Sequence, residues 1–412
     1  MSTDPKASVL EDVWMQVFSL LLIVAGIFSL HYMLRPAQAQ SEPLAAALPA
    51  AAQPVQARPL TEALPAPARQ EAPAAPLPEA AAEKPAAPRV PGRWVVGKPG
   101  ETGVNCSSLG DAVTRAADGD SIALLPGTYE VSVLTSKSLS ISGGGRSPEA
   151  VELTNSLNPT FAVSGGRLVM ENLTISNTSE MDYWALSVSR ATVVLRSVNV
   201  RSSGKGVKVQ GGDLEASDCE FEASTGLSVS GKSKVKLTGV SITGRAIGVS
   251  AQDSQADLQV DGSHISGGGG AGLRVSDGAW ARVSGTTISG NRYAGIMVAS
   301  GAEVRVSKSQ LTGNGECGAY IEENGKLVLE KVTLTRNKCG VGFAGAGSLE
   351  ARGNKFADNS LGAIAVSPLE GDKALITGSG NSGLLVPGEK RPADKKRAAA
   401  AAAEEEDAAS EE

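Results

Sequence analysis

Residues 311–321 read LTGNGECGAYI, and residues 334–343 read LTRNKCGVGF. These segments repeat an asparagine, a cysteine and a glycine in the same order, about 23 residues apart. ISGNRYAGI, from Ile288, and FADNSLGAI, from Phe356, extend the series in both directions. Self-similarity at such a period indicates a stacked repeat, and the 48 glycines and 4% aromatic residues suit that architecture better than one bulky core.

Each repeat unit contains three short segments in which apolar residues alternate with polar ones. One unit shows the pattern with Leu273 and Val275, then Ala281 and Val283, then Ile288. A period of two predicts β-strands, so each unit of about 20 to 26 residues holds three strands. Three such strands cannot enclose a core alone, so each unit must stack on the next as one coil of a solenoid. The sequence therefore predicts an all-β parallel β-helix of about ten coils, spaced by about 4.8 Å.

One turn of the repeat carries the same amide side chain in successive units, at Asn291, Asn314, Asn337 and Asn359. Amides in equivalent places on stacked coils can hydrogen-bond to one another as a ladder. We interpret these four residues as structural.

The chain before the repeats begins with a short segment, 1–12, followed by an apolar run at 13–34. The run lacks Asp, Glu, Lys and Arg, and its length predicts one transmembrane helix. A cleaved signal peptide is the alternative, because Ala37-Gln38-Ala39 offers a small-x-small site, but the acidic start and the long apolar run favour an anchor. Lys6 and Arg35 flank the run equally, so charge does not decide the orientation.

Three further segments follow in the predicted domain organisation. An Ala/Pro-rich linker covers 35–92, the β-helix domain covers 93–386, and a charged tail, predicted to be disordered, covers 387–412. A proline-rich tether and cysteines in stacking positions favour a bacterial inner-membrane protein with a single span and its β-helix in the periplasm.

The start of the repeat region carries a resemblance to a known group of proteins. Residues 111–145 contain a short amphipathic helix, a turn at Asp118-Gly119-Asp120, a strand and Pro126-Gly127-Thr128-Tyr129. This resembles the opening of right-handed parallel β-helix proteins of the pectate-lyase-like superfamily, especially NosD-like and other carbohydrate-binding or sugar-hydrolase-type repeat members. The resemblance covers about 94–385. It implies the fold and leaves activity open, because the superfamily includes lyases, hydrolases, esterases, epimerases and members without chemistry.

Matching positions of successive coils contain no paired carboxylates of the kind that a hydrolase needs. The nearest candidates for catalysis are Asp257, Asp261 and His264, with Arg282 in the following coil. His264 aligns with polar residues of later coils, which predicts a surface residue. We therefore expect no catalytic site.

The remaining charged residues and histidines give no sign of a metal, a cofactor or a nucleic-acid partner. Residues 93–385 hold 27 Lys and Arg against 28 Asp and Glu, without a basic stripe, which argues against nucleic-acid binding. The two histidines lie far apart and no Cys-x-x-Cys pair is present, so no metal site is expected.

The repeated cysteines, Cys317 and Cys339, lie one coil apart, so their α-carbons should be about 5 Å from each other. That spacing permits either a disulfide or a pair of stacked thiols. Cys219 aligns with apolar positions and is expected in the core, whereas Cys106 has no evident partner.

Large side chains gather at one place on the predicted surface. Arg274, Met297 and Tyr320 form an outward column, with Tyr293 and Trp280 in nearby turns. Such residues bind sugar rings or mark protein interfaces.

The sequence thus predicts a membrane-anchored, extracytoplasmic protein that binds or scaffolds envelope polysaccharide or an envelope protein complex without catalysis. A polysaccharide lyase or hydrolase with a divergent active site is the alternative. The oligomeric state stays open.

Overall fold

The computed structural model describes residues 90–179, 181–366 and 374–384. The chain divides into two units, Met1–Ala82 and Glu83–Glu412, and every described residue belongs to the second. The predicted segments at 1–12, 13–34 and 387–412, and the linker up to residue 89, lie outside the described residues. Within the described ranges, no helix is long and apolar enough to cross a membrane.

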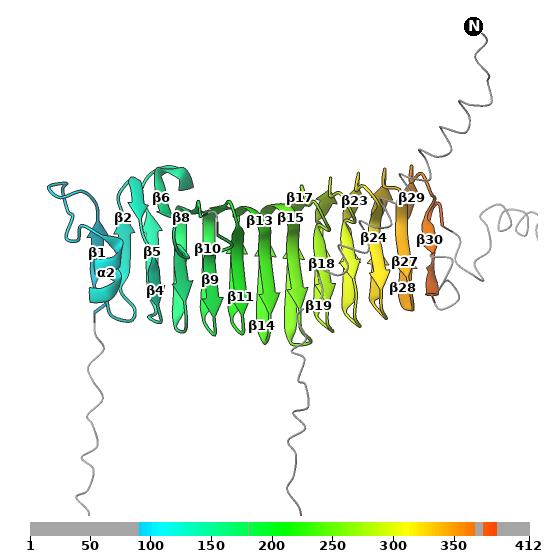
Figure 1. The fold of residues 1–412 in the computed structure, drawn as a ribbon, viewed down its shortest axis with the longest axis horizontal. Coiled ribbons are helices and arrows are strands. Elements are labelled where there is room, and N and C mark those ends of the chain that lie inside the picture. The colour runs from blue at the N-terminus through cyan, green and yellow to red at the C-terminus, as the bar shows by residue number, and fades with distance from the viewer. Residues whose placement is uncertain (1–89, 180, 367–373, 385–412) are drawn as a thin grey trace, which may run out of the picture. The chain divides into compact units, whose positions relative to one another are not determined.

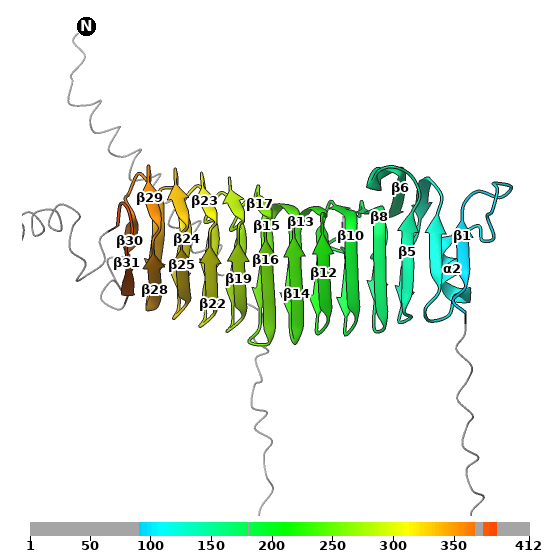
Figure 2. The same ribbon diagram turned by 180° about the vertical axis from the view of Figure 1, so that it is seen from behind.

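The second unit is a parallel β-solenoid, which confirms the predicted all-β class. Its strands form three walls, called A, B and C in the order in which the chain visits them within one coil, and they stand side by side along the stack (Figures 1 and 2). The solenoid has about 11 turns, against the expected ten or so.

Wall A and the strands that reach it from wall C have the following bounds. Wall A contains β4 (Val133–Thr135), β7 (Phe161–Val163), β9 (Trp184–Ser189), β11 (Lys205–Gln210), β18 (Leu273–Ser276), β21 (Ile296–Val298), β24 (Cys317–Glu322), β27 (Cys339–Ala344) and β30 (Ile364–Val366). Two long strands run from wall C into wall A, namely β13 (Glu220–Ser230) and β15 (Ser241–Gln252).

Wall B contains the longest row of strands. It includes β1 (Arg93–Val96), β2 (Ser121–Leu124), β5 (Leu139–Gly143), β12 (Asp213–Ser217), β14 (Ser233–Thr238), β16 (Ala256–Asp261), β19 (Trp280–Ser284), β22 (Glu303–Ser307), β25 (Lys326–Glu330), β28 (Gly347–Arg352) and β31 (Ala374–Ser379). Two strands continue from wall B round the corner into wall C, namely β8 (Arg167–Asn177) and β10 (Thr192–Ser202).

Wall C contains the remaining strands. They are β3 (Gly127–Glu130), β6 (Val151–Asn155), β17 (His264–Ser266), β20 (Thr287–Ser289), β23 (Gln310–Thr312), β26 (Thr333–Thr335) and β29 (Lys355–Ala357). A short 3-10 helix, Pro148–Ala150, precedes β6.

The corner between walls B and C bends at one residue in the left-handed region in coil after coil. These residues have φ between 48° and 69°, and they are Asn172, Ser197, Asp218, Gly239, Gly262, Gly285, Lys308, Lys331, Gly353 and Gly380. Glycine adopts this conformation without a steric penalty, and Asn and Asp tolerate it better than most residues. Five of the ten are glycines, and further left-handed glycines, such as Gly290 and Gly313, lie in the turn from wall C to wall A.

Polar side chains link the corners from coil to coil. In the turn from wall C to wall A, Asn291 donates to Asn314 at 2.9 Å, Asn314 to Asn337 at 3.1 Å, and Asn337 to Asn359 at 3.1 Å. The corner between walls B and C has a second ladder that the sequence reading did not find. It includes the bond from the backbone amide of Thr286 to Ser309 and the bond from Asn354 to Asn381.

The core runs along the inside of the stack and is built from the inward residue of each alternation. Its largest fully buried side chains include Phe161, Phe221 and Phe343. Helix α2 (Leu109–Arg115) packs on the first coils and buries Leu109, while the ammonium group of Lys137 donates to three carbonyls at the end of the helix, 2.6 to 2.8 Å away. The helix therefore covers the apolar residues that the first coil would otherwise expose.

The register predicts different costs for the same substitution on the two faces of a coil. Val306→Asp would bury an unpaired carboxylate in the core, because Val306 is only 1% exposed, and we expect a loss of about 3 to 5 kcal/mol of stability. Lys308→Asp, at an exposed corner, should change stability by less than about 0.5 kcal/mol. Thermal melting of the two variants tests the register, and equal effects would contradict it.

Candidate functional site

The outward column of wall A is formed by strands in strict register. Arg274 of β18 pairs with Met297 of β21, Met297 pairs with Tyr320 of β24, and Tyr320 pairs with Gly342 of β27. Neighbouring residues such as Leu273 point into the core, so the column faces outward. Three large side chains thus follow one another at the strand spacing of about 4.8 Å.

Gly342 determines how the ring of Tyr320 lies. A β-carbon at residue 342 would come within 2.5 Å of Tyr320 Cδ2 and 2.8 Å of Cys317 Sγ. Any side chain larger than hydrogen would therefore clash with the ring, which leans over the backbone of the next coil. The sequence reading missed this residue, although a glycine next to a tyrosine in the column was a signal that could have identified it.

Tyr293 comes from the turn before β21 and packs against Tyr320. The ring centroids are 5.4 Å apart and the planes meet at 68°, an edge-to-face arrangement that is typical of favourable aromatic pairs. Burial raises the pKa of both phenols, and the nearby charges of Glu322 and Glu316 raise the pKa further. A hydrogen bond between the two hydroxyls raises the pKa of Tyr293 and lowers that of Tyr320. Both hydroxyls therefore stay protonated at neutral pH, with the proton of Tyr293 donated to Tyr320.

Glu322 ends β24 on the same wall and was not among the predicted site residues. Partial burial raises the pKa of its carboxyl group, the adjacent Glu323 raises the pKa further, and Arg274 opposes both effects. We name Arg274, Met297, Tyr293, Tyr320 and Glu322 the tyrosine patch. It combines aromatic faces with a cation, a carboxylate and two phenolic hydroxyls.

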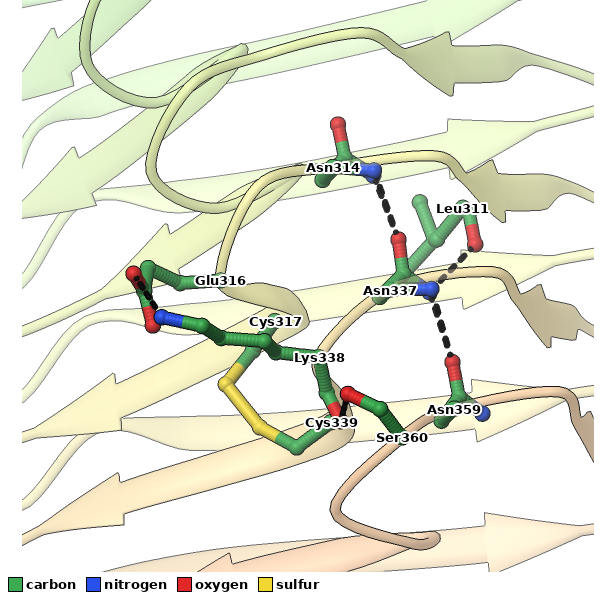
Figure 3. The surroundings of a disulfide bond; sticks show 9 residues. All are labelled: Leu311, Asn314, Glu316, Cys317, Asn337, Lys338, Cys339, Asn359 and Ser360. Carbon is green, nitrogen blue, oxygen red and sulfur yellow. Dashed lines mark hydrogen bonds and ion pairs between the residues drawn. A yellow bond between two sulfur atoms is a disulfide. The ribbon is translucent and has the colours of Figure 1, made fainter.

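A disulfide joins the coil of β24, which carries Tyr320, to the coil of β27 (Figure 3). Cys317 of β24 and Cys339 of β27 have α-carbons 4.5 Å apart, and the strands pair at these residues. Lys338 and Glu316 form an ion pair of 2.6 Å beside the bond, and Figure 3 shows the asparagine ladder passing next to it. The coil that carries Tyr320 is thereby tied to the coil that carries Gly342. Cys106 and Cys219 are free and buried.

Trp280 lies away from the other predicted patch residues. It begins β19 on wall B, where it pairs with Asp257 and Glu303, and the guanidinium of Arg282 lies over its ring at 5.0 Å. The sequence reading put it in a turn near the column, but the left-handed residues Asp277 and Gly278 lie in the turn between walls A and B, and Trp280 comes after them.

The weak catalytic candidates do not converge in the structure. Asp257 and Asp261 lie on one face of β16, four residues apart, which corresponds to about 13 Å of strand. Paired carboxylates of glycoside hydrolases lie about 5 to 9.5 Å apart. His264 lies beyond the corner on wall C, so only Asp257, Asp261 and Arg282 share a wall. In the described ranges, no cluster of three or more His, Cys, Asp or Glu residues could hold a metal ion.

Most acidic residues of the middle coils face basic residues of adjacent coils. Glu215 stands opposite Lys236, and Asp213 stands opposite Lys234, in the register of β12 and β14. Arg196 bonds to Glu171 at 2.5 Å across β10 and β8. Opposite charges in neighbouring coils reduce repulsion along the outer surface.

Comparison with known proteins agrees with this architecture. The sequence matches the family described as right handed beta helix region over residues 184–321 and 225–386. The chain is a right-handed parallel β-helix. No curated protein matches it significantly in sequence.

Solved structures share the fold at low identity. The A-module of mannuronan C-5 epimerase AlgE4 from Azotobacter vinelandii is 13% identical and has a TM-score of 0.52, with 68% of this chain and 93% of that chain covered. DFA-IIIase from Arthrobacter chlorophenolicus is 13% identical with a TM-score of 0.47, covering 70% and 94%. Pectin methylesterase PemA from Erwinia chrysanthemi is 11% identical with a TM-score of 0.35, covering 57% and 82%. At these identities the likeness extends to the fold alone.

The disulfide should stabilise the domain measurably. It closes a loop of 22 residues, one whole coil, and restraining such a loop in the unfolded chain contributes about 3 kcal/mol. We expect reduction to lower the melting temperature and Cys317→Ser to remove this sensitivity. Cys219→Ser is the control and should leave the sensitivity intact. An unchanged melting temperature on reduction would contradict a stabilising bond.

Proposed function

We propose that the β-helix binds envelope polysaccharide at the tyrosine patch and does not change it chemically. The observation that carries the proposal is the ring of Tyr320, which leans over Gly342 and is buttressed by Tyr293 at 5.4 Å. A positioned ring can stack on the apolar C–H face of a sugar, at little entropic cost. Arg274, Glu322 and the phenolic hydroxyls supply the hydrogen bonds that sugar hydroxyls require.

The acidic groups of the patch fit binding better than hydrolysis. Hydrolysis needs two carboxylates with separate roles. Of the two other carboxylates near Glu322, Glu316 is bound to Lys338 at 2.6 Å, and Glu323 accepts a hydrogen bond from Ser300 at 2.9 Å.

A lyase or hydrolase is the second candidate, and one observation favours it. The raised pKa of Glu322 suits a general acid, because such a group must keep its proton near the working pH. Arg274 acts on the same carboxylate and could face a sugar carboxylate. Detection of product decides between the two functions.

The binding test uses the full chain with pectic, alginate and peptidoglycan-derived glycans. We expect at least one to bind, and Tyr320→Ala to weaken that binding about tenfold, as loss of a central aromatic anchor does. Tyr183→Ala, at a partly exposed tyrosine far along the stack, is the matched control and should bind as the unaltered chain does. Equal losses of affinity in both variants would show that the tyrosine patch is not the binding site. New unsaturated or reducing ends would show that the protein cleaves the glycan.

We further propose that the domain lies outside the cytoplasm, held to the inner membrane by residues 13–34. The apolar run and the Ala/Pro-rich segment support this arrangement, as does the disulfide, since such bonds persist in oxidising compartments. A reporter that is active only after export, fused after Pro387, should be active. A reporter active only in the cytoplasm should be silent there, and the reverse pattern would overturn the location.

A further inference from the structure

The two ends of the stack are built differently. Figures 1 and 2 show α2 at one end and β30 at the other. At the first end, α2 covers the core and buries Leu109, Ala112 and Val113. At the other end, Ile364 of β30 and Ile376 of β31 stand in the inward rows but are only partly buried. Within the described residues, the core is therefore closed at the α2 end and uncovered at the β31 end.

Large apolar side chains also reach solvent around the uncovered core. Leu361 is 65% exposed, Val366 is 40% exposed and Leu375 is 62% exposed. They lie on the last strands of walls A and B and in the turn before β30. We name Leu361, Ile364, Val366, Leu375 and Ile376 the open end. Exposed apolar residues that gather in this way mark places where proteins associate.

The backbone at the open end has unused hydrogen-bonding groups. Within the described ranges, β30 pairs only with β27, and β31 pairs only with β28. Alternate residues of a parallel strand direct their N–H and C=O groups to opposite sides, so the outer edge of β31 offers donors and acceptors. The asparagine ladders also stop here. Asn337 donates to Asn359 and Asn354 donates to Asn381, and in this part of the chain neither acceptor donates to a further coil.

The edge of β31 lacks the usual protection against pairing with another chain. Proteins protect edge strands with charged side chains, proline, bulges or a covering element. β30, β31 and residues 380–384 contain no Lys, Arg, Asp, Glu or Pro. By contrast, β1, the first strand of wall B, begins with Arg93. An uncharged edge beside exposed apolar residues is suited to pair with a further strand.

Two observations favour a second copy of this chain as the partner. Residues 387–412 contain no Val, Ile, Leu, Met, Phe, Tyr or Trp, so this segment cannot supply large apolar side chains to the open end. The α2 end is closed, so the open end of one copy does not continue onto the first coil of another. Contact between two open ends remains, and it places the same apolar surface on both sides.

We infer that two copies of the chain associate through their open ends as a two-fold symmetric dimer. A two-fold axis perpendicular to the stack sets β31 of one copy antiparallel to β31 of the other, so each edge satisfies the other's donors and acceptors. β31 is the longest strand at this end, with six residues. The contact removes apolar surface of Leu375 and Ile376 from water. Because both copies use the same surface, assembly ends at two chains.

The dimer does not depend on the proposed function, because the open end and the tyrosine patch involve different residues. One consequence does rest on that function. Tyr320 lies on β24, two strands before β30 on wall A, so contact between open ends brings two tyrosine patches toward the middle of one rod. Linked sites raise the overall affinity for a polymer well above that of either site.

Sedimentation of the full chain in detergent tests the dimer. We expect the unaltered chain to sediment as two copies. Leu375→Lys should raise the dissociation constant at least about tenfold, because like charges would face each other across the contact. Leu375 is 62% exposed, so the lysine leaves the core intact. Leu134→Lys is the matched control, since it makes the same exchange on β4, at a leucine that is 73% exposed, and should leave the dimer unchanged.

Cross-linking through one introduced cysteine tests the geometry of the contact. Thr377→Cys places a thiol on β31, and a short bismaleimide should join two copies through it. Arg305→Cys is the control, because Arg305 is exposed in the same outward column of wall B, three coils earlier, and should give no linked dimer. The free cysteines, Cys106 and Cys219, are buried and should contribute little background.

Several results would overturn the inference. They are a monomeric unaltered chain, a dimer that Leu375→Lys leaves intact, equal weakening by Leu134→Lys, and no cross-link at Thr377→Cys or an equal one at Arg305→Cys. None of these measurements involves a glycan. Failure of the proposed function and failure of the dimer are therefore distinguishable.

Discussion

The structure depends on one constraint, the in-register hydrogen bonding of parallel strands from one coil to the next. Each strand donates to and accepts from its neighbours at about 4.8 Å, so residue positions one coil apart become direct neighbours. A side chain that points inward in one coil has another inward side chain below it, as Val298 has Ile321. The same rule places Arg274, Met297 and Tyr320 in one outward row, and Cys317 beside Cys339. Core, patch and disulfide are thus consequences of a single register.

Register alone does not make the chain turn from one wall to the next. The residues at the corners do this. A left-handed residue turns the chain between walls B and C, and buried amides such as Asn314 and Asn337 occupy the turn into wall A. A buried amide without a partner would cost about 1 to 3 kcal/mol, so each asparagine depends on the one in the next coil. The ladder therefore couples the positions of the turns, and Tyr293, which projects from one of these turns, is held in place with them.

The repeating features of the fold could be predicted from the sequence. Features that depend on one particular side chain could not. Alternation and period were enough to derive three strands per coil, the column through Tyr320 and the closeness of the cysteines. The reading put Trp280 in a turn beside the column, although the left-handed residues Asp277 and Gly278 before it lie where wall B begins. Gly342 was also missed, since it acts through the space that it leaves, and that space depends on the rotamers of neighbouring side chains. Glu322 was missed because its raised pKa arises first from burial, which a strand pattern does not report.

The position of the disulfide matters because coils near an end of the stack are held less firmly than those in the middle. An internal coil is held by two neighbours, whereas coils toward an end have fewer contacts and open more easily. In the last described strands of walls A and B, the inward residues Ile364 and Ile376 are only partly buried, so the coils here gain less from apolar burial than those in the middle. The ring of Tyr320 rests on Gly342 of the next coil in that direction, and any separation of the two coils would remove its support. The bond between Cys317 and Cys339 joins these same two coils, so the geometry of the tyrosine patch is maintained even if the strands beyond it open.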